Sequence, residues 1–466
     1  MRCWLVLISL GHLCGCAHYQ PKPLAAGDTA RNLRARTLAD QGLRDFLEAN
    51  RPELAKAWPR TVWNLDELTW AAFYFHPSLE VARAEWDVAQ AGIRTAGGHP
   101  NPTVTVTPAY DSGIAGNFSP WLPTIIFDLP IETAGKRHRR IEQAKFLSES
   151  ARLNIATAAW QVRSALRNSM LDHAAAEQRV SLLQQQVAVQ QEVGDRLKHQ
   201  LQAGAIATAE ITAARVALAK ASAELADAQR QVATARVRVA DSVGVPVSAL
   251  AGVSLEIDLS GPSTAEPLLP AEFRDTALHS RIDILGALSE YAATQSALQL
   301  EIAKQYPDVH LSPGYSWNQG NQGDSQWQLG LTVELPVLNR NQGPIAEAEA
   351  RRKAAAARVL ALQARIIGEI DGAVALYDAG QKNLAALQSL MAARQAQREN
   401  TKAQFAAGAT DRLELASSEL EFNAAALAEF DARVQLRQAI DALEDAVQRP
   451  FELPKAIYDA HASNAR

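Results

Sequence analysis

The feature that most constrains this chain is the position of its prolines. None of its 21 prolines falls in residues 131–245 or 345–448. Proline in a helix interior costs about 3 kcal/mol, so runs this long without one favour very long helices. Each run is broken once, at Gly204 and at Gly408. Because glycine readily takes the left-handed conformation that ends a helix, the sequence predicts two long helical hairpins that turn at 204 and 408.

The predicted helices that follow the two glycines carry a coiled-coil pattern. Large apolar residues and alanines each recur every seven positions, which requires a closely packed neighbouring helix along the whole seam. The first run has Ile211, Leu218, Leu225, Val232 and Val239 with Ala214, Ala221, Ala228 and Ala235, and the second run has Leu413, Leu420, Leu427 and Val434.

The chain contains two copies of one unit, about 205 positions apart. Self-similarity held in register indicates a duplication and not merely a shared composition. Matching pairs are Pro102 and Pro307, Pro108 and Pro313, Tyr110 and Tyr315, Gly204 and Gly408, and Pro246 and Pro450. We assign 64–262 to the first repeat and 263–450 to the second, with an N-terminal segment at 17–63 and a C-terminal tail at 451–466.

Helix lengths indicate how the repeats fit together. At about 1.5 Å per residue, the helix predicted over 136–202 spans roughly 100 Å. The helix predicted over 205–245 is shorter, and so is the opening helix of the second repeat, 271–304. Their combined length matches the long helix, so we expect these two to stack end to end. Asn64, with Glu67 three residues later, predicts a capping box at the start of the first repeat.

Four short segments are predicted to be strands, at 102–107, 124–130, 308–315 and 326–335. The first alternates threonine and valine, which indicates a strand with one polar and one apolar face. No later segment has the ~18–20 apolar residues of a spanning helix, so a membrane would have to be crossed by strands. Membrane barrels begin near eight strands, so several chains would have to contribute theirs.

The N-terminus has the pattern of an export signal. All three cysteines, Cys3, Cys14 and Cys16, lie there, which leaves no disulfide framework in the rest of the chain. Arg2 and a short apolar core precede Leu13-Cys14-Gly15-Cys16, which resembles a bacterial lipobox. The resemblance implies a lipoprotein signal peptide at 1–16, lipidation at Cys16 and sorting to the outer membrane. A plain cleaved signal and a short membrane anchor remain alternatives.

Charge and motifs argue against several functions. The net charge of -5 is unlike that of a nucleic-acid-binding domain. The sequence has no Gly-rich phosphate loop, no nucleophile elbow and no Cys/His ligand set, which predicts neither an enzyme nor a bound cofactor or metal. Individual histidines such as His99, His138 and His310 could contact a metal ion only in transit.

The duplication, the two glycine turns and the strand-to-helix joints at 129–132 and 335–343 together resemble the TolC-like outer-membrane efflux factor family. The resemblance covers about 64–450, and the Asn-Arg-Asn-Gln-Gly stretch at 339–343 is typical of the heavy-metal cation branch. It implies a mainly α-helical fold with short membrane β-strands. It further implies a homotrimer with a twelve-stranded β-barrel in outer-membrane lipid and a periplasmic α-helical barrel. The implied partners are a periplasmic adaptor and an inner-membrane pump of the resistance-nodulation-division (RND) type, and the implied function is a passive exit duct.

The resemblance also implies two functional sites near the turns. The hairpin tips would contact the adaptor, through Leu201, Ala203, Gly204, Ala205, Phe405, Ala407, Gly408, Ala409 and Thr410. Glu210 and Glu414 each follow their glycine by six positions, and Glu414 matches an aspartate that narrows the closed pore in the family. Three copies of Glu414 would repel one another and attract cations. The family's second aspartate corresponds to Ser417, which puts a second ring in doubt. The alternative is an ordinary solvated carboxylate.

Two further groups flank the predicted strands. Aromatic residues at a barrel rim sit well at headgroup level, which suggests that role for Tyr110, Trp121, Tyr315, Trp317 and Trp327. Four cations begin the first long helix, where the helix dipole disfavours them: Lys136, Arg137, Arg139 and Arg140. They are interpreted either as contacts to anionic headgroups or as a solvated basic turn.

Two other functions remain open from the sequence. A soluble coiled-coil scaffold would explain the heptads, but not the alternating strands or the lipobox. A periplasmic adaptor also has a helical hairpin, but a single one between split β-domains, whereas this chain carries two complete copies.

Overall fold

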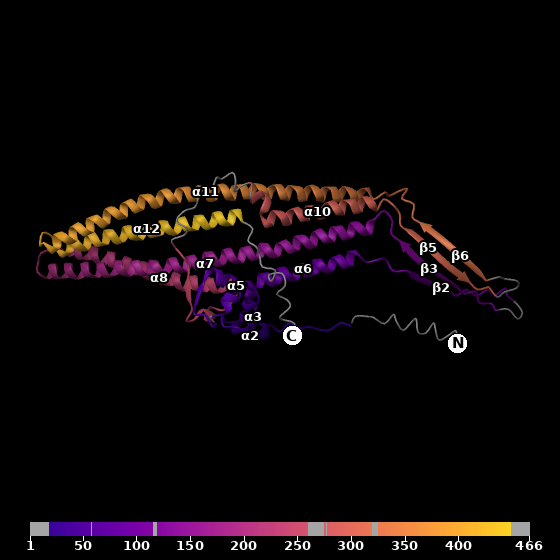
Figure 1. Cartoon of the computed structure of the whole chain (residues 1–466), viewed down its shortest axis with the longest axis horizontal. Helices are drawn as coiled ribbons and strands as arrows, with labels where there is room; N and C mark the ends of the chain where they lie inside the picture. Colours follow the sequence, from indigo (N-terminus) through magenta and orange to yellow (C-terminus); the bar gives the residue numbers. More distant parts are fainter. Residues whose placement is uncertain are drawn as a thin grey trace.

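The computed structural model of the chain describes residues 18–56, 58–114, 119–259, 275, 277–318 and 325–448. The predicted lipidation site Cys16 and the tail at 451–466 lie outside these residues. The molecule is elongated, with its strands gathered at one end and its long helices extending to the other (Figure 1). A small N-terminal domain lies against the helices partway along (Figure 1). The chain is mainly helical with short strands, which confirms the predicted fold class.

Two helical hairpins form most of the molecule. The first consists of α7 (Lys136–Gln202) and α8 (Thr208–Val243), and the second of α11 (Gln342–Ala406) and α12 (Arg412–Val447). Gly204 and Gly408 each have φ +73°, in the left-handed region, and a Cβ at either would meet nothing within 4 Å. Glycine is therefore needed at both turns for its backbone conformation and not for close packing.

Along the middle of α8 the small seam positions are more deeply buried than the large ones, which are buried only at the two ends of their series, Ile211 and Val239. Ala221, Ala228 and Ala235 are buried, whereas Leu218 and Leu225 of the same helix are half-buried. The α12 seam follows the same rule through a second heptad series that the sequence analysis did not pick out, namely Ser418, Ala425, Ala432 and Ala439. Small side chains at the seam let the helix backbones approach closely.

The shorter helices stack end to end, but with partners other than those predicted. The end of α8 meets the joint between α5 (Leu65–Phe75) and α6 (Pro77–Ala96), because a Cβ on Gly244 would lie 2.8 Å from the carbonyl oxygen of Phe75. Arg36 Nη1 donates to the carbonyls of Phe75 (2.7 Å) and Gly244 (2.9 Å). The α8 helix thus continues into the opening helix of its own repeat and not into that of the next.

The second repeat has the same arrangement. The end of α12 meets α10 (Ile282–Ala303), the two helices being aligned in Figure 1. Arg281, which immediately precedes α10 and is 3% exposed, donates from Nη1 to the carbonyl of Ala446 (2.8 Å). At each of the two joints, a buried or half-buried arginine therefore connects the stacked helices by donating to a carbonyl at the end of the first.

The N-terminal domain packs on α7 and α8. It comprises α2 (Ala26–Ala35), α3 (Gln41–Asn50), α4 (Pro52–Ala55), β1 (Val62–Asn64) and α5, with η2 (Val247–Leu250) and β4 (Ser254–Glu256) from the connector between repeats. Strand β1 pairs in parallel with β4. Trp63 and Phe73 lie in its core and are at most 1% exposed. The predicted capping box is confirmed, because the side chain of Asn64 caps the Glu67 amide and the Glu67 side chain caps that of Asn64.

The four-stranded sheet has the order β2-β3-β5-β6, and all its pairs are antiparallel. Its strands are β2 (Thr103–Thr107), β3 (Thr124–Ile131), β5 (Val309–Ser316) and β6 (Gln326–Val333). The pairing register places one set of residues on a common face, and all of them are apolar or aromatic: Val104, Val106, Ile125, Phe127, Leu129, Ile131, Val309, Leu311, Pro313, Tyr315, Trp327, Leu329, Leu331 and Val333. The other face is mainly polar, with threonine, serine, glutamine, Asp128 and His310.

Strands β2 and β6 are the two edges of this sheet in the part of the chain that is described. Every residue of both is exposed. Among the described helices, none has a stretch long and apolar enough to cross a membrane.

Candidate functional site

Both hairpin tips lie at the end of the molecule opposite the sheet (Figure 1). The predicted contact residues gather there. Ala203, Gly204, Ala205, Ala407, Gly408 and Ala409 are exposed, Phe405 is 39% exposed, and Leu201 and Thr410 are half-buried. The tips therefore present small residues and one aromatic ring to their surroundings, a surface that another protein could approach closely.

The two tips differ in how the returning helix is held. The side chain of Asp411 caps α12 by accepting a hydrogen bond from the Glu414 amide (2.8 Å), whereas Ala207 at the start of α8 offers no side-chain cap. Glu414 is exposed in the first turn of α12, and its carboxylate accepts a hydrogen bond from Thr410 Oγ1. Glu210 is exposed in the first turn of α8. A carboxylate in either place is favoured by the helix dipole.

An ion pair close to the tip connects the two hairpins, and the sequence analysis missed it. Arg412 in α12 binds Glu192 in α7 through two bonds, Nε to Oε1 (2.6 Å) and Nη2 to Oε2 (2.7 Å). These hydrogen bonds lower the pKa of Glu192 and raise that of Arg412. The first repeat has Thr208 in the place of Arg412, so neither periodicity nor the duplication indicated the pair.

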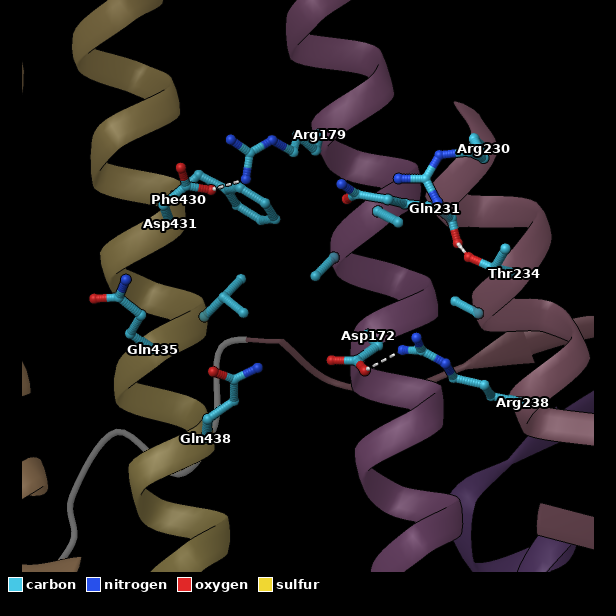
Figure 2. A pocket seen from close by; sticks show the side chains of 14 residues that line it. Asp172, Arg179, Arg230, Gln231, Thr234, Arg238, Phe430, Asp431, Gln435 and Gln438 are labelled. Carbon is cyan, nitrogen blue, oxygen red and sulfur yellow. Dashed lines mark hydrogen bonds and ion pairs between the residues drawn. The ribbon is translucent and has the colours of Figure 1, made fainter. Parts of the chain in front are cut away.

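A charged groove lies between α7, α8 and α12 (Figure 2). Its volume is about 530 Å³. Arg179 binds Asp431 across the groove (2.9 Å), and Arg238 approaches Asp172 (3.5 Å). Burial raises the pKa of Asp431, although Arg179 opposes this shift. The groove thus presents paired charges of both signs, contributed by three helices that are far apart in sequence.

The groove lies on the face of α7 that is turned away from the N-terminal domain. Ile155, Leu166 and Met170 of α7 pack in the core of that domain. At 3.6 residues per turn, the groove residues Asp172 and Arg179 lie roughly a third of a turn away from them around the helix. The wall formed by α8, α7 and α12 therefore has the N-terminal domain on one side and the charged groove on the other.

The four cations at the start of α7 have protein partners and so do not form a free, solvated basic turn. Their contact with anionic headgroups stays a prediction. Lys136 is 7% exposed, and its Nζ donates to the Tyr306 carbonyl (2.6 Å) and to Asp308 (2.8 Å). Arg137 donates to the Gly97 carbonyl (2.7 Å). The carboxylates of Glu132 and Glu142 bind Arg140 (2.9 Å) and Arg139 (2.7 Å), respectively. The Lys136 and Arg140 contacts fasten the base of the sheet to α7, and the Arg137 contact joins α7 to the end of α6. The partners of Lys136 and Arg137 are distant in sequence, so spacing could not reveal them.

The predicted aromatic residues form two clusters at the end of the sheet that is distant from the helices. The rings of Tyr110 and Trp121 meet edge to face at 5.2 Å between centroids. Tyr315 lies 4.5 Å from Trp317 and 4.7 Å from Trp327. Trp121 is 55% exposed and Trp327 is 82% exposed. This arrangement suits a boundary where one side of the ring is apolar and the other wet.

One histidine has an acidic partner on the polar face of the sheet. His310 Nδ1 lies 2.9 Å from Asp128 Oδ2, and Ser312 Oγ donates to Asp128 Oδ1 (3.0 Å). His138 lies apart from this pair and approaches Glu142 at 3.7 Å. In the described part of the chain, no group of three or more His, Cys, Asp or Glu side chains could hold a metal ion.

Comparison with solved structures gives the same fold. The outer membrane protein VceC from Vibrio cholerae matches with a TM-score of 0.65 and 20% identity, covering 82% of this chain and 95% of that one. The CmeC outer membrane channel from Campylobacter jejuni matches with a TM-score of 0.66 and 12% identity, covering 93% of this chain and 94% of that one.

Sequence comparison gives the family. The cobalt-zinc-cadmium resistance protein CzcC from Cupriavidus metallidurans is 27% identical over 266 residues, which are 57% of this chain and 61% of that protein. The chain therefore spans less than two thirds of that relative. A family model described as outer membrane efflux protein matches residues 74–245 and 274–447, which is most of the chain. This chain belongs to the outer membrane efflux protein family, whose members are channels and not enzymes.

Proposed function

We propose that this chain is the outer-membrane exit duct of a tripartite efflux pump and that it conducts its cargo passively from periplasm to exterior. The observation that carries the proposal is the two-faced sheet with two exposed edges, which Lys136 and Arg140 fasten to the first helical hairpin. An open sheet edge in hydrocarbon leaves costly unpaired backbone groups. Pairing β6 of one copy with β2 of the next removes them.

Three copies are the proposed assembly. Three sheets of four strands give twelve strands, which lies within the range of membrane barrels. The apolar face would then contact lipid, and the polar face, with Asp128 and His310, would line the channel. The hairpins of three copies would form the periplasmic barrel, and the charged groove would face its interior because the N-terminal domain occupies the other side of the wall.

The proposed partners follow from the two ends of the molecule. Lipidation at Cys16 would anchor the chain in the outer membrane. The exposed tips at Gly204 and Gly408 would contact a periplasmic adaptor, which would connect the duct to an RND-type pump in the inner membrane. Glu414, and Glu210 beside it, would narrow the closed pore near these tips.

Divalent heavy-metal cations are the cargo we propose. The support is the likeness to a cobalt-zinc-cadmium resistance protein, together with the mixture of carboxylates and paired arginines on the proposed interior wall. Deletion of the gene should raise sensitivity to such cations more than to uncharged drugs. Equal sensitivity of the deletion strain and its parent to a panel of metals would contradict this cargo.

Membrane fractionation tests the duct itself. We expect the chain to partition with the outer membrane and to run as an SDS-resistant trimer that heat converts to a monomer. A species that remains soluble without detergent would instead support a coiled-coil scaffold. Replacing Cys16 by serine in the same assay tests the anchor, since the variant should lose incorporated acyl label.

A further inference from the structure

The apolar face of the sheet is not smooth, because it contains a hollow of about 340 Å³. The hollow is lined by parts of β3 and β5, by Trp317 just beyond β5 and by Trp327 of β6. The side chains that face it are apolar or aromatic, and they include Ile125, Phe127 and Pro313. None of the lining residues carries a charge.

The sequence of β5 explains why the hollow exists. On the apolar face, β5 presents Leu311, Pro313 and Tyr315 in turn. The compact ring of Pro313 fills less space than its two neighbours, so the surface dips between Phe127 on one side and the aromatic rings on the other. Tyr315 lies against both Trp317 and Trp327, at 4.5 and 4.7 Å between ring centroids. These contacts make one side of the hollow a firm aromatic wall.

The position of the hollow decides what can occupy it. It interrupts a face on which every paired residue is apolar or aromatic. Its lining runs from the boundary aromatics Tyr315, Trp317 and Trp327 to Phe127 and Pro313, so it would open where the hydrocarbon meets the headgroups if that face contacts lipid, as the proposed function requires. It lies mainly over the two inner strands, so strand pairing at the edges β2 and β6 leaves it open. It also lies toward the end of the sheet away from the helices, which in the proposed orientation is the outer leaflet.

We propose that this hollow is a binding site for one acyl chain of an outer-leaflet lipid. The chain would lie over Pro313, between Phe127 and Trp327, so that a trimer would hold three lipids. Because no lysine or arginine lines the hollow, the site should select for the hydrocarbon chain and not for the charge of the headgroup. The ring of Trp327 is 82% exposed in the free chain, and the bound acyl chain would pack against one of its faces.

Native mass spectrometry of the trimer tests this inference. The protein would be reconstituted with phosphatidylglycerol or phosphatidylethanolamine of identical chains and then washed with detergent. We expect three retained lipids per trimer with either headgroup. Trp327→Ala removes the wall and should lower occupancy by about tenfold, the effect of losing one good aromatic contact. Ile125→Phe fills the hollow with a larger ring and should exclude the acyl chain by the space that it takes. Trp121→Ala is the matched control, since Trp121 is an exposed aromatic outside the hollow, and it should retain the lipids.

Three results would overturn the site. These are a wild-type trimer without retained lipid, an Ile125→Phe trimer that retains as much as wild type, or retention that follows headgroup charge. The SDS-resistant trimer band confirms that each variant is folded. If the proposed function were wrong, there would be no membrane-embedded trimer to wash, whereas a conducting trimer without bound lipid would refute only the site.

Discussion

The two long helices, α7 and α11, descend from one duplicated unit but have different surroundings. Helix α7 lies in the middle of the protomer, between α8 and α6 on one side and α12 and α10 on the other. Leu166 and Met170 of α7 are at most 1% exposed. Helix α11 packs mainly on α10 and α12, and it leaves Leu360 (66%) and Leu376 (61%) exposed.

This difference is the one that the proposed trimer would produce. Similar sequences would bury similar surfaces if one chain were the whole structure. Helix α11 has exposed leucines and helices on fewer sides than α7, which indicates an edge of the protomer at which we expect a second copy to pack. The same reasoning applies to β2 and β6, the exposed edges of the sheet. The protomer therefore resembles one third of a wall, with α7 at its centre.

The largest effect that we predict is a loss of folding stability on removal of a buried arginine from α7. Arg167 of α7 is 1% exposed and binds Glu444 (2.8 Å), Asp445 (2.7 Å) and the Asp441 carbonyl (2.9 Å) of α12. Arg167→Ala should lower the free energy of unfolding by about 3–5 kcal/mol, because it leaves these acidic groups without their buried cation. Thermal unfolding followed by circular dichroism measures the loss.

Arg358 on α11 supplies the control for that prediction. It is exposed, so Arg358→Ala should change the unfolding free energy by no more than about 0.5 kcal/mol. Comparable losses for the two variants would mean that α7 is no more central to the fold than α11.

The second prediction concerns the exposed Leu360 of α11. Leu360→Glu places a charge where we expect another copy to pack, so the trimer should dissociate while the protomer keeps its helical content. Multi-angle light scattering in detergent would show the change in mass. The same substitution at Leu390, which lies nearer the tip of α11 and is 43% exposed, should weaken the trimer less. A Leu360→Glu protein that stays trimeric would place the contact between copies elsewhere.

A smaller effect is expected at the ion pair that joins the hairpins. The bond to Arg412 lowers the pKa of Glu192 below its ordinary value of 4.5. A carboxyl with a lowered pKa stabilises the folded form above its ordinary pKa, and this stabilisation is lost as the pH falls through the lowered value. The link should therefore weaken in acid, below about pH 4.5, by ~0.5–1 kcal/mol for a partly exposed pair.

Channel conductance as a function of pH measures that link. The wild-type channel should become more conductive below about pH 4.5, and Glu192→Gln should give the higher conductance already at neutral pH and lose the acid response. An acid response that persists in Glu192→Gln would assign it to another group.

The smallest predicted effect compares the two tip carboxylates directly. Glu414 and Glu210 occupy matching places in the two repeats. Only Glu414 lies in the first turn of a helix that an aspartate side chain, that of Asp411, caps. If Glu414 narrows the pore, Glu414→Ala should raise single-channel conductance in planar bilayers, with a smaller rise for Glu210→Ala. Conductance unchanged in both variants would leave these residues as ordinary solvated carboxylates.

Sequence reasoning worked where the cause is local. Prolines, glycines and heptads act within a few turns of helix, so the hairpins at Gly204 and Gly408, the alanine seam and the Asn64 capping box could all be predicted. The alternation of Thr and Val in β2 likewise predicted two faces for the sheet.

The sequence did not reveal contacts that depend on how distant elements dock. Helix lengths alone allowed α8 to stack on either of two helices, and only the approach of Gly244 to Phe75 shows which. The partners of Lys136 and Arg412 come from segments far along the chain and have no counterpart in the other repeat that would have signalled them. Charged residues that looked solvated are in several cases the links between helices.

The central claim is that several copies close the sheet into a channel, and single-channel recording of the purified chain in planar bilayers tests it most directly. We predict discrete, uniform conductance steps from the SDS-resistant trimer fraction and none from monomers prepared with Leu360→Glu. A trimer that inserts into the bilayer without carrying current, or monomers that give the same steps, would contradict the account.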